Sequence, residues 1–223
     1  YHANLANCGL GGALNRAKAL LPNDTRIVIF SDQDTVFSRS VVGAISQALR
    51  SATGLKEPYV IAPKFSDRSV VAENIKFLQR SCLPTAGMAM HASTLGLMEE
   101  FSENFFLDFV DFEWCWRNSR RGVKFYEMDG VELNQKLGEG RFTNSIFSVN
   151  IPSPVRHYYQ FRDTLFLQTL SYVPLRSKLR FLGVLPIKLC IYPFLLSEGT
   201  DRFIYMVKGI VAWMKRARGI ISD

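Results

Sequence analysis

The sequence has 223 residues and a formal net charge of +7, from 27 lysines and arginines against 20 aspartates and glutamates. Hydrophobic residues make up 48% of the chain and aromatic residues 13%, which excludes an intrinsically disordered protein. The four cysteines lie far apart and form no CxxC motif. This spacing excludes a disulfide-stabilised miniprotein and a zinc-ribbon site, and we expect reduced thiols in a cytosolic chain.

Apolar patterning along the first 150 residues predicts strands that alternate with helices. The run RIVIFS at 26–31 indicates a buried strand, and Ser38 is a suitable N-cap for a helix that extends to about residue 52. The other expected elements are a short helix at 12–21, strands at 59–62 and 124–128, a strand or loop at 85–91, and a helix at 110–121. This alternation predicts an α/β fold with a mostly parallel sheet flanked by helices.

The character of the sequence changes near residue 150, where Pro152 and Pro154 interrupt the pattern. The apolar run at 182–196 has 15 residues, fewer than the roughly 20 that a membrane-spanning helix needs. At 203–214, apolar residues recur at helical spacing beside basic ones, which indicates an amphipathic helix. We therefore predict an α/β domain over 1–150 and a helical, basic segment over 151–223.

The excess positive charge is confined to this second segment. Residues 1–150 hold 16 basic and 16 acidic side chains, whereas residues 151–223 hold 11 basic and 4 acidic ones. Basic and apolar residues in one segment favour an anionic membrane surface as partner. No helix-turn-helix, zinc-finger or RNA-recognition pattern is present, so we do not expect nucleic-acid binding.

The triplet Asp32-Gln33-Asp34 follows the strongest predicted strand. In open α/β sheets, ligands bind beyond the carboxyl ends of strands, and two carboxylates there suit a hard cation such as Mg²⁺ or Mn²⁺. Equally, an aspartate pair after a strand forms a turn or caps the next helix.

The segment NCGLGGALN at 7–15 is rich in glycine. Glycines let a backbone pass close to a ligand, and the start of the following helix offers free N–H groups to a phosphate. The alternative is a tight turn before a helix, since neither a complete GxGxxG nor a Gly-Lys-Ser/Thr motif is present.

Three acidic residues, Asp108, Asp111 and Glu113, lie among bulky side chains in the segment FFLDFVDFEWCWR at 105–117. An aromatic environment raises the pKa of a carboxyl group, which suits a general base. An ion-pair network with Arg117, or a plain N-cap at Asp111, is the alternative.

The segment SPVRHYYQFRD at 153–163 combines arginines with tyrosines. Arginine makes bidentate contacts to phosphate, so this segment is a candidate for binding a diphosphate. A basic, aromatic helix face that packs on the rest of the fold is equally consistent with the pattern.

Taken in this order, the segments resemble a known family. NCGLGGALN, IVIFSDQDT, Thr85-Ala86-Gly87, NFFLDFVDFEWCWRNSRRG, QKLG and SPVRHYYQFRD resemble the inverting family 2 glycosyltransferases, and among them the bacterial rhamnosyltransferases of O-antigen and other cell-surface polysaccharides. The resemblance extends from about residue 4 to 163. It implies a GT-A fold, a nucleotide-sugar donor such as dTDP-L-rhamnose, Mg²⁺ or Mn²⁺, and inversion at the anomeric carbon.

The resemblance also implies a role for each matched position. Asp32, Asp34 and Gln135 fall on the metal site, and Asp111 falls on the general base that deprotonates the acceptor hydroxyl. Gly87, Glu113 and Trp114 fall on the acceptor side. The expected donor-binding residues are Asn7, Gly9, Asn15, Asp32, Arg156, Tyr159 and Arg162. The expected acceptor is lipid-linked or an oligosaccharide, at the cytoplasmic face of the cell membrane.

Three departures from the family pattern affect these expectations. Gln135 replaces a histidine that usually contacts the metal, so we expect weaker metal binding. Arg162-Asp163 replaces an Arg-Asn pair. The family begins with a strand–helix–strand unit of roughly 30 residues or more that binds the nucleotide base, and this sequence starts after it. We therefore expect weak donor binding, and the alternative function is an inactive, truncated transferase that acts as a membrane-bound scaffold in polysaccharide assembly.

Overall fold

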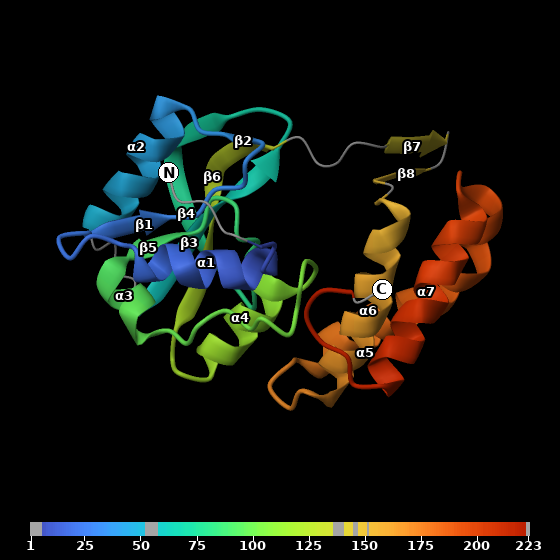
Figure 1. Cartoon of the computed structure of the whole chain (residues 1–223). Coiled ribbons are helices and arrows are strands. Elements are labelled where there is room, and N and C mark those ends of the chain that lie inside the picture. The colour runs from blue at the N-terminus through green and yellow to red at the C-terminus, as the bar shows by residue number, and fades with distance from the viewer. Residues whose placement is uncertain (1–5, 52–57, 136–140, 145–146, 151, 222–223) are drawn as a thin grey trace. The chain divides into compact units, whose positions relative to one another are not determined.

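The computed structural model describes residues 6–51, 58–135, 141–144, 147–150 and 152–221; of residues 135, 141–144 and 147–150 it describes the backbone alone. The chain divides into two compact units (Figure 1). Unit 1 consists of Tyr1–Ala19, Phe101–Glu113 and Gly138–Asp223, and unit 2 of Leu20–Glu100 and Trp114–Leu137. The units alternate along the chain, and each is described by itself. The predicted division into functional segments at residue 150 stays a prediction.

Unit 2 contains a six-stranded sheet with the order β1-β5-β3-β6-β2, in which β4 also pairs with β6. Of the described pairs, β3 and β6 run parallel, and the remaining pairs are antiparallel. The strands are β1 (Ile27–Ile29), β2 (Thr35–Val36), β3 (Tyr59–Ser66), β4 (Val70–Arg80), β5 (Ala89–His91) and β6 (Lys124–Gln135). The fold is thus α/β with a mixed sheet.

The prediction of a mostly parallel sheet is wrong for two reasons. The helix α2 (Arg39–Arg50) joins β1 to β3, which run in the same direction, but β5 lies between them and runs in the opposite direction. A turn of three residues after β3 then reverses the chain into β4. All residues of β4 are exposed or half-buried, so the strand lacks the apolar run by which buried strands are recognised in a sequence.

Helices cover both faces of this sheet. On α2, Val41, Ile45 and Leu49 are buried against one face, in the same core as Ile29 and Tyr126. The predicted cap is confirmed, because the Ser38 hydroxyl accepts a hydrogen bond of 3.3 Å from the Val41 N–H. Side chains alternate between the two faces of a strand, so Phe30 and Phe125, the sequence neighbours of Ile29 and Tyr126, lie on the other face. Trp114 packs there against both rings. Trp114 belongs to α4 (Val110–Ser119), whose first turn is part of unit 1; α3 (Ala92–Leu97) follows β5.

Unit 1 is mainly helical. It contains α1 (Gly9–Ala19), α5 (Pro154–Thr169), α6 (Leu175–Leu195), α7 (Gly199–Met214) and the hairpin of β7 (Arg141–Asn144) and β8 (Phe147–Asn150). Helices α5, α6 and α7 pack on one another (Figure 1). Gly209 allows a close approach of α7 to α5, because a Cβ there would lie 2.5 Å from the Tyr158 carbonyl oxygen. Pro186 and Pro193 lie inside α6, so neither ends the helix. Among the described residues, no helix has both the length and the apolar character needed to cross a bilayer.

Candidate functional site

The first group of predicted site residues lies in unit 2, beyond the carboxyl end of β1. The Phe30 N–H donates to the Met88 carbonyl at 2.8 Å, so the chain is held in place until two residues before Asp32. The Asp32 carbonyl then accepts from the Thr35 N–H at 3.2 Å and closes a turn. Asp32 is half-buried and Asp34 is exposed. The triplet therefore forms a turn, as one alternative proposed, and the same turn presents the Asp34 carboxylate to solvent.

Gly87 lies beside this turn. Its N–H donates to the Phe30 carbonyl at 2.9 Å, and its φ of +84° is in the left-handed region that favours glycine. A Cβ at this position would lie 3.0 Å from the Leu133 side chain and from the Pro63 ring. These contacts hold the backbone of Gly87 against the residues that lead into the aspartate turn. A larger residue at this position would disturb that packing.

Strand pairing brings the backbone of Gln135 to the same region. In the antiparallel pairing of β2 with β6, Thr35 faces Gln135, so the backbone at 135 lies next to the residue that follows Asp34. The Gln135 side chain lies outside the described residues. Two carboxylates and an amide would offer oxygen ligands of the kind that Mg²⁺ prefers. Among the residues with described side chains, no group of three or more His, Cys, Asp and Glu is placed to hold a metal ion. The metal site stays a prediction.

The second group lies in unit 1, where the glycine-rich segment packs against residues 101–106. A Cβ on Gly9, whose φ is +71°, would lie 2.7 Å from the Phe106 carbonyl oxygen, and the Leu10 N–H donates to that oxygen at 3.0 Å. The Asn15 side chain exchanges two hydrogen bonds with the backbone of Phe101. Close packing within unit 1 accounts for Gly9 and Asn15, whereas Asn7 is exposed, and its side chain accepts from the Gly9 N–H.

Asp111 lies in the first turn of α4, not at its N-cap. It is half-buried, and its Oδ1 accepts from the Phe112 N–H at 2.9 Å. Phe109, just before the helix, has a φ of +67°, a conformation that costs a non-glycine residue about 1 kcal/mol or more. The rings of Phe109 and Phe112 pack against Phe181 of α6 at centroid distances of 4.9 and 6.4 Å. The two aromatic contacts fix the backbone on both sides of Asp111.

A cation lies close to Asp111. Arg156 of α5 donates to both carboxylate oxygens of Asp108, with distances of 2.8 to 3.3 Å. This hydrogen bond raises the pKa of Arg156, and the charges of Asp108 and Asp111 add to the effect. The Arg156 side chain is 45% exposed, so it has room for a further partner. Within unit 1, the structure thus brings together two predicted site residues, Asp111 and Arg156, and the neighbouring Asp108.

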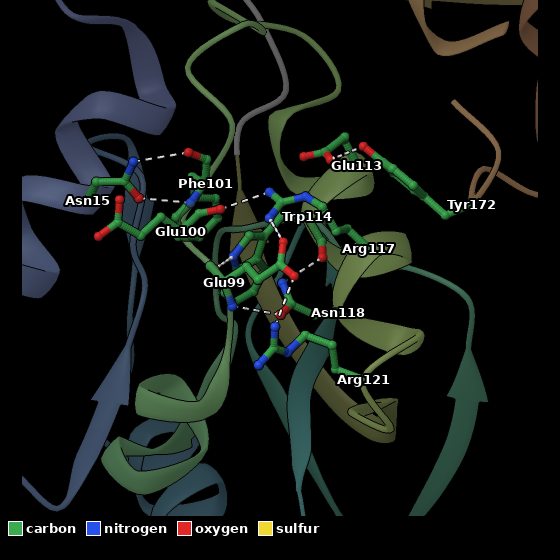
Figure 2. A network of polar contacts seen from close by, with 10 residues as sticks. All are labelled: Asn15, Glu99, Glu100, Phe101, Glu113, Trp114, Arg117, Asn118, Arg121 and Tyr172. Atoms are coloured by element: carbon green, nitrogen blue, oxygen red, sulfur yellow. Dashed lines mark hydrogen bonds and ion pairs between the residues drawn. The ribbon is translucent and has the colours of Figure 1, made fainter. Parts of the chain in front are cut away.

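The two residues after Asp111 in the acidic motif are buried. Glu113 is 1% exposed, and its carboxylate accepts a short hydrogen bond from the Tyr172 hydroxyl. Trp114 is fully buried, and its indole N–H donates to the Glu99 carbonyl at 2.7 Å (Figure 2). Both side chains thus have internal partners. Their role in acceptor binding stays a prediction, and it would be an indirect one in which they hold α4 in place.

Arg117 forms an ion pair with Glu99, an acidic residue outside the motif at 105–117. Arg117 donates to Glu99 Oε2 at 2.6 Å and to the Glu100 carbonyl at 2.7 Å, and Arg121 donates to Glu99 Oε1 at 3.0 Å (Figure 2). These hydrogen bonds lower the pKa of Glu99. Arg117 thus pairs with Glu99 in unit 2, and Asp108 pairs with Arg156 in unit 1.

Tyr159 and Arg162, two of the predicted donor-binding residues, are also internal. Tyr159 stacks on Phe106 at 4.9 Å, and its hydroxyl accepts from the Ile221 N–H. Arg162 has no exposed side-chain surface; it pairs with the fully buried Asp163 at 2.7 Å and donates to the Gly219 carbonyl. These two residues attach α5 to the C-terminal residues, and their roles in donor binding stay predictions.

Sequence similarity points to one class of enzyme. Over 128 residues, 56% of this chain, the sequence is 30% identical to the dTDP-rhamnosyl transferase RfbF of Shigella flexneri. The match covers 40% of that protein, so the chain spans about two fifths of the length of this relative. No family model matches the chain. The similarity supports a relationship with glycosyltransferases.

Two contacts of the site were not predicted from the sequence. Tyr172 lies 59 residues from Glu113 and Arg156 lies 48 residues from Asp108, so neither partner follows from local spacing. Of the three acidic residues in the aromatic segment, Asp108 is the one to which the resemblance assigns no role, and this was the available signal that it has a partner elsewhere. No pattern in the sequence singles out Tyr172.

Proposed function

We propose that the protein is a glycosyltransferase of the GT-A type, related to inverting family 2, that acts in the synthesis of a cell-surface polysaccharide such as O-antigen. The proposed donor is dTDP-L-rhamnose, and the proposed acceptor is lipid-linked or an oligosaccharide at the cytoplasmic face of the cell membrane. The similarity to a dTDP-rhamnosyl transferase over 128 residues supports the choice of donor.

The observation that carries the proposal is the arrangement around the aspartate turn. The turn Asp32–Thr35 follows β1, Gly87 approaches its base, and the pairing of Thr35 with Gln135 brings a distant strand end to the same place. Oxygen-bearing residues from two strand ends, beside a glycine at which the backbone packs closely, suit a charged diphosphate with its cation.

The residues that would hold a divalent cation are Asp32, Asp34 and Gln135. When bound there, Mg²⁺ or Mn²⁺ would stabilise the negative charge that develops on the departing nucleoside diphosphate. The turn geometry keeps Asp34 exposed, and the half-buried Asp32 adds a second carboxylate.

Asp111 is the proposed general base. Its carboxylate takes the proton of the acceptor hydroxyl while the hydroxyl oxygen bonds to the anomeric carbon of the sugar. The bond between that carbon and the diphosphate oxygen breaks, the electron pair leaves with the diphosphate, and attack from the opposite side inverts the configuration. Arg156 carries a positive charge that attracts the Asp111 carboxylate.

The remaining predicted residues fall into two groups by exposure. The exposed Asn7 and the partly exposed Arg156 are proposed to contact the donor directly. The others have internal partners, and we propose that they position the segments that carry Asp111 and Gly87. They are Gly9, Asn15, Glu113, Trp114, Tyr159 and Arg162.

The experiment is a turnover assay with dTDP-L-rhamnose, a membrane lipid extract as acceptor and a manganese titration, read as dTDP release and as sugar transferred. Asp34→Asn should raise the manganese concentration for half-maximal turnover by at least about tenfold. Asp67→Asn, on the exposed turn after β3, is the matched control and should leave it unchanged. Gln135→His should lower that concentration, on the order of tenfold, because imidazole binds Mn²⁺ more strongly than an amide does.

Two outcomes would contradict the proposal. Equal turnover by Asp34→Asn and Asp67→Asn would remove the aspartate turn from the site. Absence of any dTDP release from the wild-type chain, together with retention on a polysaccharide assembly complex, would instead support the scaffold function.

A further inference from the structure

Helix α6 exposes a wide apolar surface, which we call the outer face of α6. Phe194 is 87% exposed and Leu175 is 70% exposed, far more than is usual for large apolar side chains that occur together. The outer face consists of Leu175, Leu179, Leu182, Val184, Ile187, Ile191, Phe194 and Leu195. These residues are spread over the 21 residues of α6, with Arg176 and Arg180 exposed among the first of them.

Charge is excluded from most of this face. Lys188 is the one charged residue between 182 and 195, and its ammonium group points inward. It donates to the Gln160 side chain of α5 at 2.6 Å and lies 5.9 Å from the centre of the Tyr192 ring. Burial lowers the pKa of Lys188. The outer face therefore carries no exposed charge over its last 14 residues, a property that the sequence, with a lysine in mid-run, does not reveal.

Basic residues lie at the borders of the apolar surface. Arg176 and Arg180 are exposed near the start of α6, and Lys208, Lys215 and Arg216 are exposed on or just after α7. Glu198 and Asp201 are exposed just after α6, so the charged residues around the apolar stretch are mostly but not all basic. An apolar stretch with arginines at its start is complementary to an anionic lipid surface, where acyl chains contact the apolar side chains and headgroups contact the arginines.

Helix α7 is the less suitable of the two helices for lipid contact. It buries Met206, Gly209 and Ala212, and Arg202 donates to the carbonyls of Ser197 and Pro152 inside unit 1. The sequence pattern placed the amphipathic helix at 203–214, but the structure gives that helix an internal packing role with a narrower exposed strip of apolar residues. These are Phe203, Ile204, Val207 and, at the end of the helix, Met214.

The inner side of α6 contacts the segment that carries the candidate base. Phe181 packs on Phe109 and Phe112, which flank Asp111, and Tyr172, just before the helix, donates to Glu113. One helix thus has an apolar outer face, free of exposed charge over its last 14 residues, and an inner face in contact with the candidate catalytic segment, and both belong to unit 1.

We propose that α6 lies in the interface of an anionic phospholipid bilayer, with its outer face among the acyl chains and Arg176 and Arg180 at the headgroups. This position holds Asp111 near the membrane surface, where the hydroxyl of a lipid-linked acceptor is accessible. The statement about the acceptor rests on the proposed function; the lipid contact does not, because it depends on the outer face alone.

Co-sedimentation of the full chain with vesicles tests the contact without donor or acceptor. Vesicles of equal parts phosphatidylcholine and phosphatidylglycerol should bind the wild-type chain, and the double variant Ile187→Asp/Phe194→Asp should bind at least tenfold more weakly. The matched control is Leu20→Asp/Leu97→Asp, two leucines of unit 2 that are 56% and 61% exposed, which should bind as the wild type does. Circular dichroism verifies that both variants are folded.

A second pair of measurements tests orientation and charge. Phe194→Trp should gain tryptophan quenching by brominated lipids relative to the wild type, because the new ring enters the acyl region. Arg176→Gln/Arg180→Gln should reduce the preference for phosphatidylglycerol over pure phosphatidylcholine, roughly tenfold or more. About 1 M salt, where the Debye length is about 3 Å, should remove the same preference from the wild type.

Equal binding by the wild type and Ile187→Asp/Phe194→Asp would overturn the proposal. A second result would also overturn it: the wild-type chain does not bind vesicles and is a dimer by light scattering, whereas Ile187→Asp/Phe194→Asp is a monomer. The outer face would then be covered by a second copy of the chain. Either result would leave the turnover assay unaffected, so failure of the lipid contact and failure of the transferase function are distinguishable.

Discussion

The two units differ in how they hold charged side chains. In unit 2, Asp34 lies on an exposed turn, and the arginines that bind Glu99 remain partly in water. In unit 1, Arg162 and Asp163 are paired with no exposed side-chain surface at all. Unit 2 therefore uses its backbone pairing to present charges, whereas unit 1 uses buried charges to hold its helices.

This difference affects protonation. Burial, followed by the nearby Lys188 and Arg202, lowers the pKa of His157 to about 4, so this histidine is neutral at pH 7. Burial also raises the pKa of Asp163 to about 7, although the hydrogen bond from Arg162 opposes the shift. Unit 1 thus contains groups whose charge depends on the fold, and changes to them should alter stability, whereas changes to the exposed acids of unit 2 should alter ligand binding.

The largest effect is expected at the proposed general base in unit 1. Asp111→Asn removes the proposed base but keeps the size of the side chain and its acceptor oxygen for the Phe112 N–H. We expect the transfer rate to fall by about 10²–10⁴, because general-base catalysis has this magnitude. Single-turnover kinetics measure the rate, and calorimetric titration with dTDP should give an unchanged affinity. If transfer continues while dTDP binding is unchanged, the assignment of the base is wrong.

The next largest effect tests the buried pair. Arg162→Met keeps the volume of the side chain but leaves Asp163 without its cation and the Gly219 carbonyl without its donor. Removal of one partner of a buried ion pair costs about 3–5 kcal/mol, so we expect a loss of this size in the free energy of unfolding. Urea denaturation measures it. A loss below about 1 kcal/mol would show that the pair does not hold α5 to the C-terminal residues.

The same comparison explains what the sequence could predict. Strand β1 and the cap of α2 were predictable, because a buried apolar run and Ser38 act over a few residues. Strand β4 was not, because it is stabilised by pairing with β6 and none of its residues is fully buried. The candidate metal ligands Asp32 and Asp34 could be found because they directly follow a recognisable strand, whereas the inward direction of Lys188 depends on Gln160, which is 28 residues away.

Glycine-rich and arginine-rich motifs were the hardest to interpret. The segment at 7–15 has the composition of a phosphate-binding loop, but Gly9 is required by the Phe106 backbone, which fills the space of a missing Cβ. Arg162 belongs to a motif that suits a diphosphate, but its guanidinium already donates to the Asp163 carboxylate and to the Gly219 carbonyl. Composition identifies what a residue can bind, and tertiary contacts decide whether that capacity is already used.

A pH titration of stability tests the same buried pair. The pKa of Asp163 is raised in the folded state from 3.8 to about 7, so the folded protein binds a proton that the unfolded chain releases at lower pH. The wild type should therefore lose stability relative to Asp163→Asn as pH rises from about 4 to about 7 and no further above it. Arg162, Asp108 and Arg218 also act on this carboxyl and are unchanged in the variant. Parallel stability curves for the two proteins would show that Asp163 does not titrate in this range.

The smallest effects are expected at the surface pairs of unit 2, where two arginines share Glu99. Arg121 is 53% exposed and makes a single contact to Glu99, and an exposed ion pair contributes only about 0–1 kcal/mol because water and salt screen it. Arg117 is 18% exposed and also donates to the Glu100 carbonyl, which would lose this donor on substitution. Arg117→Ala should therefore destabilise the protein more than Arg121→Ala does, and about 1 M salt should reduce the effect of Arg121→Ala more than that of Arg117→Ala. Equal losses in thermal denaturation would mean that the Glu100 contact contributes nothing, and unit 2 would then depend on its sheet and apolar core alone.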